Sequence, residues 1–428
     1  MMHLRWIGIG LGLLCLACGS EDSGGQAQSG ETLDALSLSG LNESDGVDED
    51  TLDGSPSDDV EGESTDGSDG ADSEPSPWEC PESLGTQPAG VSGMVYSCLS
   101  IAEGLPYQVI RQGRFETGEV VTRAEVFAPN RLGSALATRD GWAYFDTSQV
   151  ENDLVTSRSI YRFPLEGGDV ERVREFTVES FAQVGYDAAF SQTNTALAMV
   201  LQPEGERIAF HLVDSTTGVG VGNVYSFEVG EELLLDGWVP GAEGAVRRLN
   251  WNLDGTKLVF TAGGSLIVAG ADLSGPNVLD SAVVSTPAAP VELQPSQYGY
   301  AGKKTQVRLT TVVGADEVVK DDLPFEFSAE IEGIFRRSED ELFVVAGEVA
   351  LFRISAMEAD PMGELPGFAL RHPMAMLPNG EGLVVGGSQE NVLRDFAYRL
   401  LTTDDPESEP LVSTEKSAGY VSSSVAIY

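Results

Sequence analysis

The chain has 428 residues, 41% of them hydrophobic, and a formal net charge of -43 at pH 7. The charge is uneven, since no Lys or Arg occurs between Arg5 and Arg111 while residues 21 to 79 contain 19 Asp and Glu residues. So acidic a chain repels phosphate backbones and anionic lipid headgroups, which argues against nucleic acid and anionic membranes as partners.

The first residues have the pattern of an export signal. An apolar run from Trp6 to Leu14 is too short to span a bilayer, and a small residue, Ala17, precedes Cys18. This end resembles a bacterial lipoprotein signal, in which a Cys after a small residue is acylated and becomes the mature N-terminus. The resemblance implies a signal peptide with its lipobox at residues 1–18 and lipid attachment at Cys18. Ordinary cleavage near Ala17 and an uncleaved anchor are the alternatives.

The lipoprotein resemblance also indicates where the protein resides. Gly19, rather than Asp, follows the acylated position, and by similarity to known sorting signals this implies delivery to the outer membrane. The expected location is therefore the cell envelope, on the periplasmic face or the cell surface.

Residues 19–77 are mostly Ser, Gly, Asp, Glu, Thr and Pro and contain no aromatic residue. Such a segment has too little apolar surface to offset the entropy lost on ordering, and its charges repel one another. The sequence predicts a disordered acidic tether between the anchor and the folded part, which we expect at 78–428.

Two cysteines, Cys80 and Cys98, open the folded part. In an oxidising envelope compartment, an even pair separated by 18 residues predicts a disulfide. Two unpaired buried thiols are the alternative.

A three-strand unit recurs after residue 104 and is clearest between Arg247 and Val278. Short apolar runs are separated there by the turns Asp254-Gly255 and Gly263-Gly264, in which glycine accommodates φ > 0. Three such strands expose an apolar face that they cannot bury alone, so the unit needs neighbours of its own kind. Long helical periodicity is absent, and frequent Gly and Pro disfavour helices. The sequence therefore predicts an all-β fold built from repeats.

Two landmarks mark the copies of this unit. One is the turn after the innermost strand, expected at residues 139–141, 203–205, 253–255, 300–302, 339–340 and 378–380. The other is a residue on a later strand, at Tyr107, Tyr161, Tyr225, Ile267, Val307, Phe352 and Tyr398. These residues are spaced by 54, 64, 42, 40, 45 and 46 positions, which bracket the length of a four-stranded blade. The longest interval predicts an inserted loop at Ser215 to Gly222.

The stretch Trp251 to Phe260, WNLDGTKLVF, resembles the WD40-like repeat of TolB-type β-propellers. The resemblance implies a propeller, for which the spacing favours seven four-stranded blades, with six and eight as alternatives. The terminal run Gly419 to Tyr428 alternates like an innermost strand, yet no turn follows it. Since an unpaired edge is avoided, we expect this run to complete the first blade and close the ring.

No catalytic signature is found. The two His residues left after signal processing, His211 and His372, are interpreted as structural, and Asp140 and Asp254 as turn residues. The sequence contains no nucleophile elbow, zinc-protease motif or P-loop, and we expect no catalytic residue, metal or cofactor.

The predicted function is therefore that of a monomeric, non-catalytic binding or scaffold module for a protein or glycan partner. The alternatives are a hydrolase or lyase with an acidic site at the channel mouth, and a spacer lipoprotein without a specific ligand.

Overall fold

The computed structural model describes residues 80–428 apart from 103–104, 128, 183–186, 215–219, 231–234, 239–245, 285, 315–316, 348–349, 356–357, 366–367, 390–395, 403–410 and 414–424. The chain divides into two units, Met1–Ala71 and Asp72–Tyr428. The predicted signal peptide, with Cys18, and the predicted tether both lie outside the described residues.

The described residues of the second unit form seven four-stranded antiparallel sheets, numbered here 1 to 7. In hydrogen-bonding order, sheets 1 to 3 consist of β28 (Val425–Ile427), β1 (Gly93–Ala102), β2 (Leu105–Arg114) and β3 (Val120–Phe127); β4 (Arg131–Arg139), β5 (Trp142–Glu151), β6 (Leu154–Pro164) and β7 (Glu171–Thr177); and β8 (Thr195–Leu201), β9 (Arg207–Asp214), β10 (Gly220–Glu228) and β11 (Asp236–Trp238). One short helix, α1 (Val178–Ala182), follows β7.

Sheets 4 to 7 continue the same order along the chain. They consist of β12 (Val246–Trp251), β13 (Lys257–Ala262), β14 (Ser265–Gly270) and β15 (Asn277–Asp280); β16 (Val291–Gln294), β17 (Gln297–Lys303), β18 (Gln306–Val312) and β19 (Val318–Asp322); β20 (Ile331–Arg336), β21 (Leu342–Ala346), β22 (Ala350–Ile354) and β23 (Ala359–Glu364); and β24 (Phe368–Met376), β25 (Gly382–Gln389), β26 (Phe396–Thr402) and β27 (Val412–Ser413).

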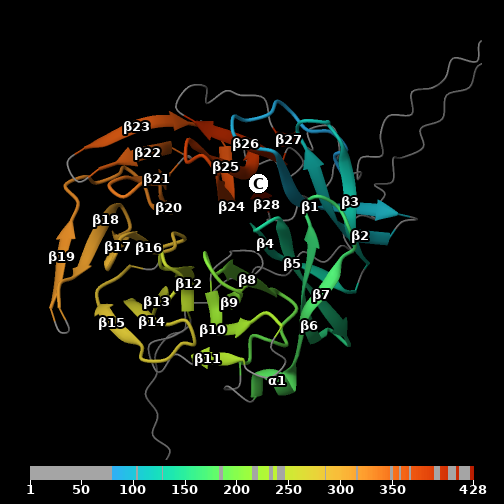
Figure 1. The fold of residues 1–428 in the computed structure, drawn as a ribbon, viewed down its shortest axis with the longest axis horizontal. Helices are drawn as coiled ribbons and strands as arrows, with labels where there is room; N and C mark the ends of the chain where they lie inside the picture. Colours follow the sequence, from blue (N-terminus) through green and yellow to red (C-terminus); the bar gives the residue numbers. More distant parts are fainter. Residues whose placement is uncertain are drawn as a thin grey trace, which may run out of the picture. The chain divides into compact units, whose positions relative to one another are not determined.

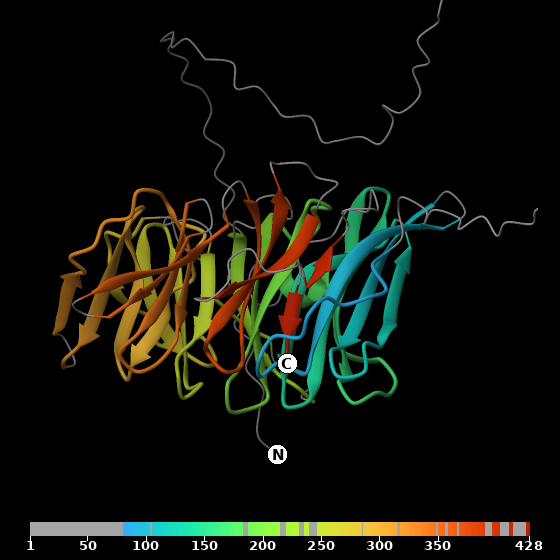
Figure 2. The same cartoon turned by 90° about the horizontal axis from the view of Figure 1, so that it is seen from above.

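Within this unit the sheets follow one another round a circle, with the first strand of each sheet innermost and the fourth outermost (Figure 1). Turned by 90°, the unit shows its strands running between its two faces (Figure 2). Each innermost strand contacts the next, and β28 contacts both β24 and β4. The prediction of an all-β, propeller-type fold made of four-stranded antiparallel sheets is confirmed.

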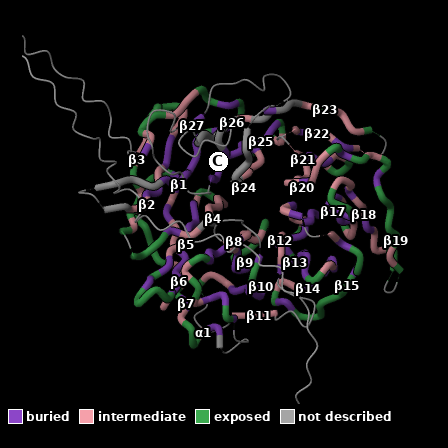
Figure 3. The backbone as a smooth tube through the Cα atoms, turned by 180° about the vertical axis from the view of Figure 1, so that it is seen from behind, coloured by how far each residue is buried: buried purple, intermediate pink, exposed green. Residues whose placement is uncertain are grey.

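The core consists of apolar clusters between consecutive sheets. Alternation within a strand explains them, because successive side chains point to opposite faces. In β9, for example, Phe210 packs toward sheet 2 whereas Ala209 packs toward sheet 4. Among the described residues, seven such clusters join every consecutive pair of sheets, including sheets 7 and 1, where Val384 and Cys98 belong to one cluster. Figure 3 shows this burial along the middle strands, whereas outer strands such as β19 are largely exposed.

The first sheet combines both ends of the described chain. In β28, Val425, Ala426 and Ile427 pair antiparallel with Tyr96, Val95 and Met94 of β1. The final residue extends the contact, since the Tyr428 carbonyl accepts hydrogen bonds from the backbone amides of Ser92 and Gly93 at 2.7 and 3.0 Å.

The seven aligned landmark residues all lie on the third strand of a sheet. Five of the six predicted turns lie between the first and second strands, but the turn expected at residues 300–302 is wrong, because those residues belong to β17. The turn there is Pro295-Ser296, and Ser296 has a φ of 65°. The missed turn contains neither the Gly nor the Asp that marks the other turns, although Pro and Ser are themselves common turn residues.

Candidate functional site

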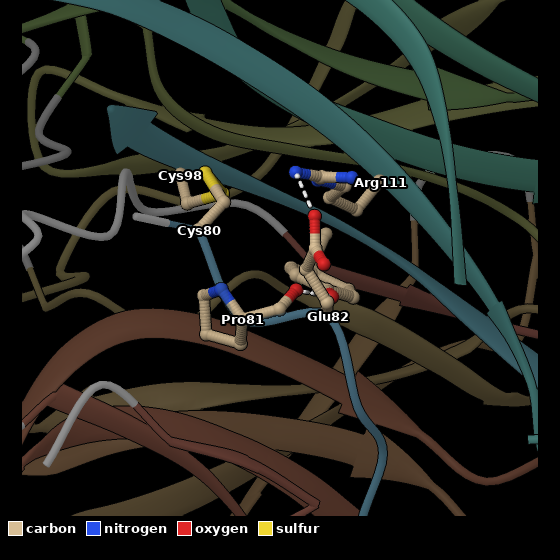
Figure 4. The surroundings of a disulfide bond; sticks show 6 residues. Cys80, Pro81, Glu82, Cys98 and Arg111 are labelled. Carbon is tan, nitrogen blue, oxygen red and sulfur yellow. Dashed lines mark hydrogen bonds and ion pairs between the residues drawn. A yellow bond between two sulfur atoms is a disulfide. The ribbon is translucent and has the colours of Figure 1, made fainter. Parts of the chain in front are cut away.

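The predicted disulfide is confirmed: Cys80 and Cys98 are bonded, with Cα atoms 5.9 Å apart. The bond fastens the segment before β1 to β1 itself (Figure 4). Two further contacts hold the same segment, as the Tyr96 hydroxyl donates to the Pro81 carbonyl at 2.7 Å and Arg111 lies 3.3 Å from Glu82. The cysteines therefore have a structural role.

The predicted lipid site, Cys18, lies outside the described residues. Within residues 80–428, as far as they are described, no helix is long and apolar enough to cross a membrane.

The two histidines lie within strands, His211 on β9 and His372 on β24. Burial, followed by repulsion from Arg248, lowers the pKa of His211 to about 3, so its ring is neutral in the folded protein. Only 3% of His211 is exposed, which leaves no route for a substrate to reach it. Asp254 stabilises its turn, since its Oδ1 accepts from the backbone amide and hydroxyl of Thr256 at 2.9 and 2.6 Å.

The glycines of the predicted loop at Ser215 to Gly222 have a packing role where they are described. Gly220 to Gly222 open β10, and residues 215–219 lie outside the described residues. A Cβ at Gly220 would lie 1.7 Å from the Val246 carbonyl oxygen, so only glycine permits this approach of β10 to β12.

Two inner strands carry interacting charges although sheet 5 lies between them. Burial lowers the pKa of Arg248 on β12 to about 10, and Glu332 on β20 opposes the shift. Burial and the nearby Glu330 raise the pKa of Glu332. Among the described residues, no group of three or more His, Cys, Asp or Glu side chains is placed to hold a metal ion.

Cavities occur at the outer side of two sheet interfaces. The larger, of ≈ 340 Å³, lies between sheets 2 and 3 and is lined by Arg172, Val173, Arg174, Glu175, Ser180, Phe227, Glu228 and Gly230. Both of its arginines have partners, because Arg172 contacts Glu175 at 2.7 Å, and the Arg174 guanidinium lies over the Phe227 ring at 4.9 Å.

The smaller cavity, of ≈ 240 Å³, lies between sheets 1 and 2 and is named here the Gln112 pocket. Its lining residues are Gln112, Arg114, Glu119, Val121, Arg123, Glu166 and Gly167. They come from β2, from β3 and the turn before it, and from the turn after β6.

Gln112 organises this pocket. Its side-chain amide is buried and donates to the Leu165 carbonyl and to the Tyr428 hydroxyl, both at 2.7 Å. Its Oε1 accepts from Nε of Arg123, also at 2.7 Å. The amide therefore uses both donors and its acceptor to join sheet 1, sheet 2 and the end of the chain.

Two guanidinium groups are held side by side at this pocket. Arg114 donates to the Leu165 carbonyl at 3.0 Å, and Arg123 lies over the Phe163 ring at 5.4 Å. Both approach Gly167, where a Cβ would lie 3.9 Å from Nη2 of Arg123 and 4.0 Å from Nη2 of Arg114. Burial and the adjacent Arg114 lower the pKa of Arg123. Planar guanidinium groups so fixed are suited to bind an oxyanion through two parallel hydrogen bonds.

No known protein family matches the sequence, and no curated protein matches it. Among solved structures, a chain of a mitotic checkpoint complex is 10% identical, with a TM-score of 0.46 over 76% of this chain and 95% of that chain. A Bacteroides fragilis protein assigned as a 6-phosphogluconolactonase is 12% identical, with a TM-score of 0.46 over 80% of this chain and 99% of that chain. Similarity at this level supports no inference about function.

Proposed function

We propose that the chain is an envelope-anchored bacterial lipoprotein whose β-propeller, of the TolB type, is a non-catalytic binding or scaffold module for a protein or glycan partner. The observation that carries the binding role is the Gln112 pocket, where two arginines are held together at an accessible sheet interface of a very acidic chain. We expect the module to act as a monomer.

The anchor in this proposal is a lipid on Cys18, supported by the apolar run and the Ala17-Cys18-Gly19 junction. The acidic segment 19–77 would then separate the propeller from the outer membrane. Metabolic labelling with a fatty-acid analogue should mark the natural chain but not Cys18→Ala, and equal labelling of both would remove the lipid from the proposal.

We further propose that the seven sheets are the blades of a ring that β28 holds closed. Support comes from the pairing of β28 with β1 and from the contacts of β28 with β24 and β4. A closed ring keeps the sheet interfaces, and hence the Gln112 pocket, at fixed geometry.

The binding role is tested by capture from isolated membranes. Immobilised full-length chain and a variant lacking residues 19–77 should retain the same partner, because the proposed site belongs to the propeller. The tether alone is the control. Capture by the tether and not by the shortened variant would contradict a propeller-borne site.

A further inference from the structure

The Gln112 pocket brings two arginines together in a chain that has 68 acidic and only 25 basic residues. Most arginines that the structure describes contact a carboxylate, such as Arg308 with Asp280 at 2.9 Å and Arg353 with Asp360 at 2.6 Å. Among the same residues, Arg123 has no carboxylate within 4.0 Å, and Arg114 only reaches Glu119 at 4.0 Å. Two like charges are thus kept adjacent, and among the described residues the carboxylates that line the same pocket, Glu119 and Glu166, make no ion pair with them shorter than 4.0 Å.

The arrangement is also rigid. Arg123, which lines the pocket, is fixed through Nε and through its position over Phe163, so its two terminal nitrogens are not used by these two contacts. Arg114 is fixed through Nη2, and the absence of a side chain on Gly167 keeps the space between the two groups open. Donors that are already oriented lose little entropy when they bind a ligand.

The pocket also restricts the charge of its ligand. Two carboxylates, Glu119 and Glu166, line it beside the arginines. A dianion such as phosphate, or a densely charged polymer, would be repelled by these groups and by the acidic chain. A single carboxylate can contact the arginines, while hydroxyl groups next to it can donate to the glutamates. A cavity of ≈ 240 Å³ is small for a drug-sized ligand and suits one sugar unit.

We propose that the Gln112 pocket binds a single uronic acid unit of an otherwise neutral glycan, with Arg114 and Arg123 on its carboxylate and Glu119 and Glu166 on its hydroxyl groups. This gives the binding module of the preceding section its ligand class and rests on that proposal.

The test is ligand-observed NMR on the full-length protein with galacturonate as probe. Galacturonate should bind more tightly than acetate, and galactose should bind at least ten-fold more weakly. Arg123→Gln should weaken galacturonate at least ten-fold, whereas Arg172→Gln, which removes the same charge from the other cavity, should leave binding unchanged. Added NaCl should weaken binding as well.

The thermal midpoint of Arg123→Gln is measured in parallel. A second variant keeps the proposal testable if Arg123→Gln proves to be unfolded. Glu119→Gln removes a carboxylate near Arg114 and should tighten acetate, which has no hydroxyl to lose, about two- to three-fold through reduced repulsion. Acetate binding that is unchanged by Glu119→Gln would contradict an arginine-held carboxylate.

Three results would overturn the ligand class: equal binding of galactose and galacturonate, tighter binding of phosphate or sulfate than of galacturonate, or tighter binding of an acidic peptide through Arg123. The outcome is separable from that of the proposed function. Partner capture that survives Arg123→Gln would refute the uronate site alone, whereas galacturonate binding without any captured partner would refute the scaffold role alone.

Discussion

The substitution Val425→Ala tests how much β28 contributes to the free energy of unfolding. Val425 lies on the inner edge of sheet 1, is 7% exposed and packs in the cluster between sheets 7 and 1. Replacing it with Ala removes two methyl groups, at about 0.8 kcal/mol each for transfer, plus a cavity term, so we expect a loss of about 2 to 3 kcal/mol. The matched control is Val278→Ala on outer edge strand β15, where Val278 is 48% exposed and the loss should stay below about 1 kcal/mol.

The assay is urea unfolding followed by tryptophan fluorescence, with free energies taken from the midpoint and slope. Deleting residues 421–428 extends the test. It removes the buried side chains of Val425 and Ile427 and the hydrogen bonds of Tyr428 with Ser92 and Gly93, for a combined loss of roughly 5 kcal/mol or more. If Val425→Ala and Val278→Ala cost the same, or the shortened chain unfolds at the midpoint of the intact one, then β28 does not hold the ring.

Three further predictions concern single sites. The double variant Cys80→Ser/Cys98→Ser should lose about 3 kcal/mol of unfolding free energy, a loss that reducing agent should reproduce in the natural chain and not increase in the variant. His211 is neutral when folded, with a pKa of about 3, and takes up a proton when unfolded below its ordinary value of 6.5. As the pH is lowered from 6.5 to 3, the free energy of unfolding should therefore decrease, and its decrease should be about 1.4 kcal/mol per pH unit steeper in the natural chain than in His211→Leu. Parallel curves for the two proteins would contradict this. Tyr428→Phe leaves one donor of buried Gln112 without its 2.7 Å partner and should cost about 1 to 2 kcal/mol in urea unfolding, whereas an unchanged midpoint would show that water replaces the hydroxyl.

The parts of the fold that repeat locally could be predicted from the sequence. Alternating apolar residues with Gly or Asp in the turns mark each copy, and Tyr161 and Tyr225 occupy the third strands because the same pattern recurs there. The turn at Ser296 was missed because the landmark was a Gly or Asp, whereas here a serine after Pro295 adopts the positive φ. The disulfide was predictable because Cys80 and Cys98 are the two cysteines outside the predicted signal peptide, and the signal resemblance implied an oxidising compartment.

The Gln112 pocket could not be predicted in the same way. Gln112 and Tyr428 are 316 positions apart, and Leu165, whose carbonyl accepts from Gln112, comes from a third region. No local motif links these residues, since they meet only when neighbouring sheets pack. The one available signal was that Arg114 and Arg123, with Arg111, are the first basic residues after more than a hundred residues with no Lys or Arg.

Sheet 1 combines β28 with β1, β2 and β3, and this arrangement constrains when the sheet can form its last strand pair. Among the described residues, β1 is the first strand along the chain and its partner β28 is the last. Until β28 has been synthesised, β1 lacks its inner neighbour and the cluster between sheets 7 and 1 lacks Val425 and Ile427. Contacts of such long sequence separation form late and slowly. In the exported lipoprotein proposed above, the pairing of β28 with β1 must therefore wait until both strands have crossed the membrane.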